Sequence, residues 1–551
     1  MKHLSITSVL VWIAMAFASV SQAQAQSQAG SDTSDLGPLL VRLVDASLSE
    51  AVELIPQLET QGGRGILPLF TAMFDNSLAV DPDSMTFYRL AEDNSARPVY
   101  PPADAGDSAE LQLSAAEADE LERIRVSNRL RVLLRDAIAR IRLFEGDADE
   151  RSIAAAELLS QLGEDTVLLL REALASEEDA EVREVLEVGI AMNVLVSDAP
   201  DEERLQVVPT LHGRLEAPVR NLLNSLLDPN GRNEQNPEVR AAIEEANAAI
   251  DTRIRFYGFI EELFYGLSLG SVLLLAAIGL AVTFGVMGVI NMAHGEMLML
   301  GAYTTYVVQL VMPGFITYSL WVAIPAAFLV SASVGILIQR YVIRYLHGRP
   351  LETLLATFGI SLILQQTVRT IFSPLNRMVV SPEWMSGTIQ INPVLAITNN
   401  RLFILIFSLI VFFALLMILR KTSLGLQVRA VSQNRNMAKA MGIRTDRVDA
   451  LTFGLGSGIA GIAGVALSQL TNVGPNLGQS YIIDSFMVVV FGGVGNLFGT
   501  LVGAFSLGVS NKFLEPAVGA VLAKIITLVF IIVFIQFRPK GLFPQKGRAA
   551  E

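Results

Sequence analysis

The feature that most constrains this chain is a series of long uncharged runs that fills its second half. The runs 263–293 and 297–339 contain no Asp, Glu, Lys or Arg. A run of about 20 apolar residues is long enough to cross the hydrocarbon core of a membrane as a helix. We therefore predict a polytopic bundle of about eight to nine crossings, at 262–286, 293–312, 319–339, 354–372, 402–419, 448–468, a short 482–494, 497–514 and 518–537.

Charge divides the chain into two parts of opposite character. Residues 27–258 hold 44 Asp and Glu against 21 Arg and no Lys, whereas residues 259–551 hold 19 Lys and Arg against 10 acids. An asymmetry of this size indicates two domains in two environments. We expect an exported helical domain at 26–258 and a transmembrane domain at 259–551.

The first 25 residues have the pattern of a cleavable secretory signal. Lys2 and His3 precede a short apolar core, and Ala23-Gln24-Ala25 follows it. The alternative is a first transmembrane helix that stays attached. Under either interpretation the acidic half is delivered outside the cytoplasm, to the periplasm.

The acidic half predicts an all-α fold with a loose repeat. Segments 147–151, 179–183 and 236–240 each begin with Asp or Asn, continue with acids, and place an Arg four positions on. This arrangement is typical of a helix start, and stacked helix pairs of this kind form an α-solenoid of the HEAT-like class. Segment 75–113, which is rich in proline, interrupts the pattern, and we interpret it as an inserted loop or a small strand pair.

Basic residues predict the orientation of the membrane half. They cluster at 340–349, at 420–447 and near the C-terminus at 538–548. Because Lys and Arg favour cytoplasmic loops, we assign these three segments, and with them the C-terminus, to the cytoplasm. The acidic domain then lies on the opposite side, in agreement with the signal sequence.

Several kinds of chemistry are excluded or disfavoured. The chain has no cysteine and four histidines, so it has no disulfide, thiolate nucleophile or Cys-ligated metal. No G-x-x-x-x-G-K-[ST] phosphate loop occurs. Residues 456–461 match G-x-G-x-x-G but lie inside an uncharged run, where small residues pack helices. The Arg-rich segment 123–142 is interpreted as a solvated helix face, so no nucleic acid is expected as a partner.

Polar residues inside the apolar runs are the candidate site. Segment 285–301, rich in glycine, contains three of them, and such groups usually face a bundle interior or a water-filled path. The alternative is that they join helices by hydrogen bonds. The spacing of His294 and Glu296 is poor for a metal, and no cofactor or metal is expected in this chain. The candidates for the path or its gate are Asn291, His294, Glu296, Gln365, Asn472, Asp484 and Asn496.

Segment 420–447 predicts a short amphipathic helix-turn-helix. Apolar residues such as Leu426, Val428 and Met441 alternate with basic and amide side chains, and Gly442 is suited to end a helix. One interpretation is a membrane-surface helix attracted to anionic lipid. The other is a docking helix for a cytoplasmic partner.

Four stretches in this order resemble the permease subunits of branched-chain amino acid-type ABC transporters. They are the Ile-Asn-Met-Ala-His-Gly-Glu core within 285–301, segment 425–446 with Ala-Met-Gly-Ile at 440–443, Phe-Gly-Gly-Val-Gly-Asn at 491–496, and Arg-Pro-Lys-Gly-Leu-Phe at 538–543. The resemblance covers about 259–546. The exported extension resembles that of the urea-type permease of the same family.

The resemblance implies a transporter subunit rather than an enzyme, in the bacterial inner membrane. It implies an ATP-driven importer of urea, a small neutral solute, in which this chain and a second permease form the path. Two cytoplasmic ATPases, which would bind ATP and magnesium, and an exported solute-binding protein complete the expected assembly, with membrane lipid around it. The alternatives are import of branched-chain amino acids or short amides, a passive channel, or a receptor-like membrane protein.

Segment 425–443 corresponds to the ATPase-coupling loop of the family. The residues that the resemblance assigns to it are Gly425, Arg429, Ala440, Met441, Gly442 and Ile443. The Glu of the usual importer pattern is absent here, so only the docking role is carried over.

Overall fold

The computed structural model describes residues 36–82, 84–91, 95–100, 111–112, 121–346 and 348–544. The predicted signal sequence lies outside these residues. By internal packing the chain divides into two units, Met1–Ile250 and Asp251–Glu551. Helix α12 (Pro237–Met287) has residues in both units.

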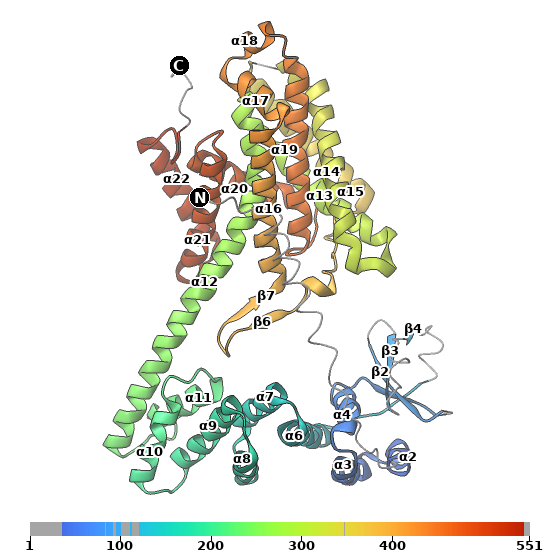
Figure 1. Cartoon of the computed structure of the whole chain (residues 1–551), viewed down its shortest axis with the longest axis vertical. Coiled ribbons are helices and arrows are strands. Elements are labelled where there is room, and N and C mark those ends of the chain that lie inside the picture. The colour runs from blue at the N-terminus through green and yellow to red at the C-terminus, as the bar shows by residue number, and fades with distance from the viewer. Residues whose placement is uncertain are drawn as a thin grey trace, which may run out of the picture. The chain divides into compact units, whose positions relative to one another are not determined.

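The first unit is mainly helical, and neighbours in the chain are neighbours in space. Figure 1 shows its helices in chain order, from blue α2 to green α11. Apolar side chains of α2, α3, α4 and α6 share one core. The helices are α2 (Gly37–Asp45), α3 (Leu48–Gly62), η1 (Gly63–Ile66), α4 (Leu67–Phe74), α6 (Asn128–Glu145), α7 (Ala148–Leu158), η2 (Leu159–Gln161), α8 (Glu164–Ser176), α9 (Ala180–Val196), α10 (Asp201–Leu211) and α11 (Ala217–Leu227).

The prediction that this half is all-α is wrong between α4 and α6. A five-stranded antiparallel sheet with the order β4-β3-β2-β1-β5 lies there, more than a loop or a strand pair. Proline suggested a loop, but Pro98 pairs with Tyr88 where the ladder shifts register, a position that tolerates a missing donor. The strands are β1 (Leu78–Asp81), β2 (Thr86–Leu90), β3 (Ser95–Tyr100), β4 (Leu111–Gln112) and β5 (Glu122–Arg123).

The three predicted helix starts are confirmed as N-caps. The Asp147 carboxylate accepts the Glu150 N–H at 2.9 Å, and Asp179 Oδ1 accepts the Val182 N–H at 3.2 Å. Asn236 Oδ1 accepts the N–H of Glu238 at 2.8 Å. Each cap satisfies backbone donors that a helix leaves without an internal partner.

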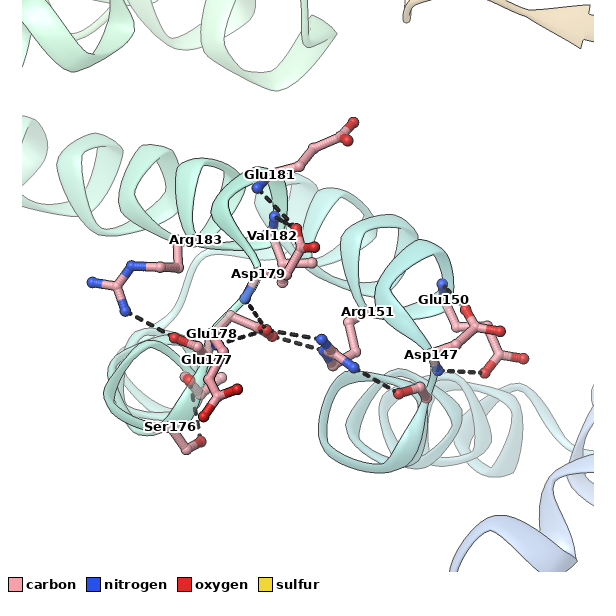
Figure 2. A network of polar contacts seen from close by, with 12 residues as sticks. Asp147, Glu150, Arg151, Ser176, Glu177, Glu178, Asp179, Glu181, Val182 and Arg183 are labelled. Carbon is pink, nitrogen blue, oxygen red and sulfur yellow. Dashed lines mark hydrogen bonds and ion pairs between the residues drawn. The ribbon is translucent and has the colours of Figure 1, made fainter. Parts of the chain in front are cut away.

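The arginine four positions after each cap donates to the end of the preceding helix. Arg151 Nη1 reaches the Gly146 carbonyl at 2.9 Å, and Arg183 Nη1 reaches that of Glu177 at 2.9 Å. Arg240 Nη2 reaches the Leu227 carbonyl at 3.0 Å. These bonds satisfy carbonyls that a helix C-terminus leaves unpaired. The repeat in the sequence is therefore a repeated helix-to-helix junction, two examples of which are drawn in Figure 2.

Glu177 is the centre of the junction in Figure 2. Arg151 binds its carboxylate through two hydrogen bonds of 2.7 and 2.8 Å, and the side chain of Glu177 is 6% exposed. The N–H groups of Glu178 and Asp179 donate to the same carboxylate. The hydrogen bonds from Arg151 hold the pKa of Glu177 below its ordinary value.

The second unit is a bundle in which α12 and α19 are central. In their apolar stretches, 83% of α12 and 78% of α19 are buried, against 17% of α22. The helices after α12 are α13 (His294–Val311), η3 (Pro313–Phe315), α14 (Ile316–Tyr341), η4 (Ile343–Leu346), α15 (Pro350–Phe372), η5 (Glu383–Met385), α16 (Asn399–Lys421), α17 (Ser423–Gln433), α18 (Arg435–Ala440), α19 (Thr445–Ser468), α20 (Leu477–Gly492), α21 (Leu497–Val518) and α22 (Ala520–Phe537), with a hairpin of β6 (Thr388–Gln390) and β7 (Ala396–Thr398) before α16.

Seven helices in the described residues are long and apolar enough to cross a membrane. Each of the nine predicted runs falls largely on a helix, but α13 is not among the seven and α20 is a shorter apolar helix. The short run predicted at 482–494 begins earlier, at Leu477. The polytopic bundle is confirmed, and the number of crossings stays a prediction.

Glycines let the central helices approach closely. A Cβ atom on Gly456 would lie 2.6 Å from the Gly279 carbonyl oxygen, and one on Gly461 would lie 2.5 Å from that of Ala327. Real Cβ atoms do not come so close to backbone atoms. The formal G-x-G-x-x-G match in α19 is therefore a helix-packing surface, as the sequence indicated.

Candidate functional site

A tight turn between α12 and α13 places the predicted polar residues in the interior. Gly288, with φ of +66°, follows the end of α12, and α13 begins at His294. Asn291, His294 and Glu296 are all at most 1% exposed. The positive φ explains the glycine, because other residues rarely adopt it.

Asn291 and His294 bind backbone groups of this region. Asn291 Oδ1 accepts the Ala293 N–H at 3.0 Å, and His294 Nε2 lies 2.9 Å from the Ala276 carbonyl of α12. Because a carbonyl can only accept, Nε2 carries the proton. His294 Nδ1 and Asn291 Nδ2 have no hydrogen-bond partner within the described chain. His294 therefore joins α13 to α12.

Glu296 points to a different helix, α15. Its Oε1 accepts hydrogen bonds from Ser361 Oγ at 2.9 Å and Gln365 Nε2 at 2.8 Å. Its Oε2 is buried and has no partner among the described residues. A buried carboxyl oxygen without a donor is costly, and it marks a place where a further hydrogen-bond donor would bind.

Ser361 and Gln365 belong to a polar row on α15. Thr353, Thr357, Ser361 and Gln365 recur every four residues and are all buried, so they lie on one side of the helix. Thr357 Oγ1 accepts the N–H of Met292 at 3.2 Å, which fixes the turn against α15. Of this row only Gln365 was predicted as a path residue; the regular spacing of four residues was the signal that could have identified the others.

Arg369 continues the spacing of this row by one further turn. Its Nη2 donates to Asn476 Oδ1 at 2.6 Å, in the loop before α20. Along this side of α15 the hydroxyl groups come first, then the two side chains that bind the Glu296 carboxyl group, and then the guanidinium of Arg369. Glu296 of α13 and Arg369 of α15 thus place an acidic and a basic group along this side of α15.

The other predicted path residues lie elsewhere. Asp484 of α20 pairs with Lys524 of α22 at 3.3 Å. Asn496 caps α21 through the Phe498 and Gly499 N–H groups, and its Nδ2 donates to the Phe543 carbonyl. Asn472 is exposed in the loop after α19. No hydrogen bond of the described chain joins these three to Glu296, so the interior group is smaller than the predicted one.

The predicted helix-turn-helix is formed by α17 and α18. Asn434 caps α18, and Gly442, with φ of +87°, follows its end. The N–H of Ile443 donates to Ala438 O at 3.0 Å and that of Gly442 to Lys439 O at 3.1 Å. This pair of bonds is the Schellman arrangement, which explains the glycine.

The helix-turn-helix has a buried and an exposed apolar side. Val428, Val431, Ala438 and Val448 pack together, and Ile443 lies against them. Three other side chains form what we call the exposed ridge, namely Leu426 (63% exposed), Met437 (60%) and Met441 (77%). Among the predicted loop residues, Arg429 donates to the Leu419 carbonyl, and Gly425 lies too close to Leu419 for a side chain.

No group of three or more His, Asp or Glu side chains in the described ranges could hold a metal ion. The interior group around Glu296 offers hydrogen-bonding groups and a carboxyl group.

Comparison with known proteins assigns the membrane half to a family. The sequence profile described as the branched-chain amino acid transport system permease component matches residues 262–535. The high-affinity branched-chain amino acid permease LivH of Salmonella typhimurium is 30% identical over 301 residues, covering 52% of this chain and 96% of LivH. BraD of Pseudomonas aeruginosa is 29% identical over 295 residues, again covering 52% of this chain and 96% of the relative.

These relatives are membrane permease subunits rather than enzymes. No solved structure matches the chain. The family match begins inside α12, so the acidic unit lies outside it. The matched residues contain the interior group around Glu296, the helix-turn-helix and part or all of each of the seven long apolar helices. The chain belongs to the branched-chain amino acid ABC transporter permease family.

Proposed function

We propose that this chain forms the translocation path of an ATP-driven importer whose solute is a branched-chain amino acid. The relatives that align with this chain over almost their whole length are branched-chain amino acid permeases. The prediction of urea depended on the resemblance of the N-terminal extension, and the family match does not include that extension. Urea is therefore the second candidate.

The observation that carries the proposal is the unpartnered Oε2 of Glu296. An α-ammonium group is a strong donor for such an oxygen, and it would complete the hydrogen bonding of the carboxylate. Arg369, further along the same row of α15, offers the complementary charge for an α-carboxylate. A neutral solute such as urea needs hydrogen-bonding groups but no pair of opposite charges.

Access to Glu296 requires α15 to move. Ser361 and Gln365 cover the carboxyl group. Only 28% of the apolar stretch of α15 is buried, so few contacts of the bundle oppose its displacement. We assign the row Thr353, Thr357, Ser361 and Gln365 to the wall of the path and Glu296 to its recognition point, while His294 holds α13 to α12.

The exposed ridge of α17 and α18 is the proposed docking site for a cytoplasmic ATPase. Three large apolar side chains at the surface, on a helical pair with a packed interior, fit a groove on a partner. ATP and magnesium would bind to the partner ATPases. A second permease and an exported solute-binding protein complete the assembly that family membership implies.

The proposal is tested by ATP-dependent uptake in vesicles that contain the chain with its partner ATPases, second permease and binding protein. Labelled leucine and labelled urea are compared at equal concentration, with and without ATP. We expect ATP-dependent uptake of leucine that exceeds that of urea. Uptake of urea alone would support the second candidate, and uptake of either solute without ATP would support a passive channel.

A further inference from the structure

A basic pocket of about 620 Å³ lies where α14 ends and α19 begins. The basic residues in its wall are Arg340 of α14, Arg344 of η4, Lys439 of α18, and Arg444 and Arg447 at the start of α19. Asp446 is the acidic residue of the wall. Five positive charges against one negative charge make a strong local preference for an anion.

Among the described residues, four of these five cations make no ion pair. Arg344 pairs with Asp446 at 3.2 Å. Within the described residues, Arg340, Lys439, Arg444 and Arg447 make no ion pair with any acid. No side chain caps the N-terminus of α19, so the positive end of this helix dipole adds to the same potential. Like charges held around one pocket repel one another, and a bound anion would relieve that repulsion.

The pocket lies at the end of a helix that is long enough to cross a membrane. Arg340 is the penultimate residue of α14, one of the helices that can cross a membrane. Two aromatic side chains are exposed here, Tyr341 (67% exposed) at the end of α14 and Tyr345 (73%) in η4. Tyrosines beside the end of a membrane helix are typical of the headgroup layer.

We propose that this basic pocket binds the phosphate of an anionic membrane lipid. Basic pockets between membrane helices are suited to such headgroups. The tyrosines beside it would lie among the acyl chains and headgroups of the same leaflet. Because Lys439, Gly442 and Ile443 belong to the helix-turn-helix, the lipid would brace α18 against the end of α14.

A lipid fits the pocket better than the other anions that could enter it. A free phosphate has no apolar part that would contact the exposed tyrosines or the end of an apolar helix. A partner protein is expected at the exposed ridge, whose apolar residues Leu426, Met437 and Met441 lie outside the pocket wall. The lipid site does not depend on the solute or on the proposed docking of an ATPase.

The experiment uses the full-length chain in phosphatidylcholine nanodiscs that contain a minor fraction of phosphatidylglycerol. Native mass spectrometry counts the phosphatidylglycerol molecules retained on release. The test variant is Arg340→Gln/Arg444→Gln/Arg447→Gln. The matched control, Lys421→Gln/Arg538→Gln/Lys540→Gln, removes the same charge from exposed positions outside the pocket. A third variant, Arg340→Lys/Arg444→Lys/Arg447→Lys, keeps the charge and serves if the Gln variant does not fold.

We expect the affinity for phosphatidylglycerol to fall about fivefold for each charge removed from the pocket. The control variant should bind the lipid almost as the wild type does, and the Lys variant should retain it. Equal losses in the test and control variants would show diffuse attraction and overturn the proposal. Unchanged retention in the test variant, or in the single variant Arg444→Gln, would also overturn it. In a competition arm, displacement of the lipid by millimolar inorganic phosphate would assign the site to a soluble anion instead.

Discussion

His294 and Glu296 are two residues apart, yet they serve different helices. Successive residues of an α-helix are rotated by about 100°, so positions i and i+2 point in nearly opposite directions. His294 consequently donates to the Ala276 carbonyl of α12, while Glu296 accepts from Ser361 and Gln365 of α15. One residue fastens the start of α13 and the other presents a carboxyl oxygen with no donor.

Replacing Glu296 with Gln tests the recognition role at the scale of a residue. Glutamine keeps the volume and one acceptor but loses the charge that would bind an ammonium group. Since hydrogen bonds to charged groups contribute about 1.5–3 kcal/mol, we expect uptake of leucine to fall roughly tenfold to a hundredfold. The matched control is Glu352→Gln, an exposed residue of α15 that pairs with Arg349. Equal uptake by Glu296→Gln and Glu352→Gln would return Glu296 to a helix-joining role.

Replacing Glu177 with Gln tests the helix junction in the acidic unit. The change removes the charge that Arg151 binds, and we expect the junction to lose about 1–3 kcal/mol. Because the pKa of Glu177 is lowered in the folded state, its contribution is present above the ordinary pKa of glutamate and is lost as the pH falls. Hydrogen exchange of α8 and α9 in the full-length chain measures the effect. The difference between variant and wild type should shrink with acidification; a constant difference would contradict this account.

The residue types of the interior group could be predicted from sequence, but their grouping could not. Polar residues in apolar runs identified Glu296 and Gln365, which lie in contact. The same rule selected Asn496, whose side chain caps α21, and Asn472, which is exposed. Apolar surroundings in the sequence do not show whether a polar group faces a path, a backbone or a loop.

At the scale of elements, small residues determine how closely the helices pack. The central α19 approaches α12 at Gly456, whereas the peripheral α15 has nothing within 4 Å of Gly359. The long apolar runs predicted the helices of this half well, since a membrane admits few other structures. Prediction was poorer for the sheet between α4 and α6, where short strands and prolines give a weak local signal.

A pair of glycine substitutions tests this packing. Gly456→Leu would place side-chain atoms against the Gly279 backbone and should separate α12 from α19. We expect the variant to lose most of its thermal stability in detergent, because backbone atoms cannot move aside as a flexible side chain can. Gly359 has open space around it, so the thermal stability of Gly359→Leu should match or exceed that of the wild type, since leucine has a higher helix propensity than glycine. Similar melting temperatures for both variants would show that the close approach is unimportant.

The exposed ridge makes a second prediction at this scale. Changing Leu426, Met437 and Met441 to Ser removes apolar contact area without touching the packed interior of the helix-turn-helix. We expect ATP-dependent uptake and co-purification of the ATPase to fall at least tenfold, as for loss of the anchor residues of an interface. The control changes the exposed Gln433 and Asn436 to Ser. Normal ATPase binding by the ridge variant would place the docking site elsewhere.

At the scale of the whole molecule, the chain combines a family permease with an acidic helical unit. The family relatives match about half of this chain, and the family profile begins at residue 262. The charge asymmetry of the sequence indicated the division. The HEAT-like solenoid remains a prediction, supported by junctions such as Arg151 to Gly146 O and Arg183 to Glu177 O, which recur between successive helices.

We infer that the acidic unit is an exported platform that receives the solute-binding protein. With 44 acids against 21 Arg in residues 27–258, it would attract a basic surface over a distance that the ionic strength determines. Deleting residues 36–236 keeps all of α12. The deletion should raise the concentration of binding protein needed for half-maximal uptake by roughly tenfold or more, while the maximal rate persists. Added salt should raise the concentration of binding protein that the wild type needs for half-maximal uptake toward the value for the deletion variant. The value for the deletion variant itself should not change with salt. If both proteins responded equally to salt, the attraction would have to come from the membrane half instead.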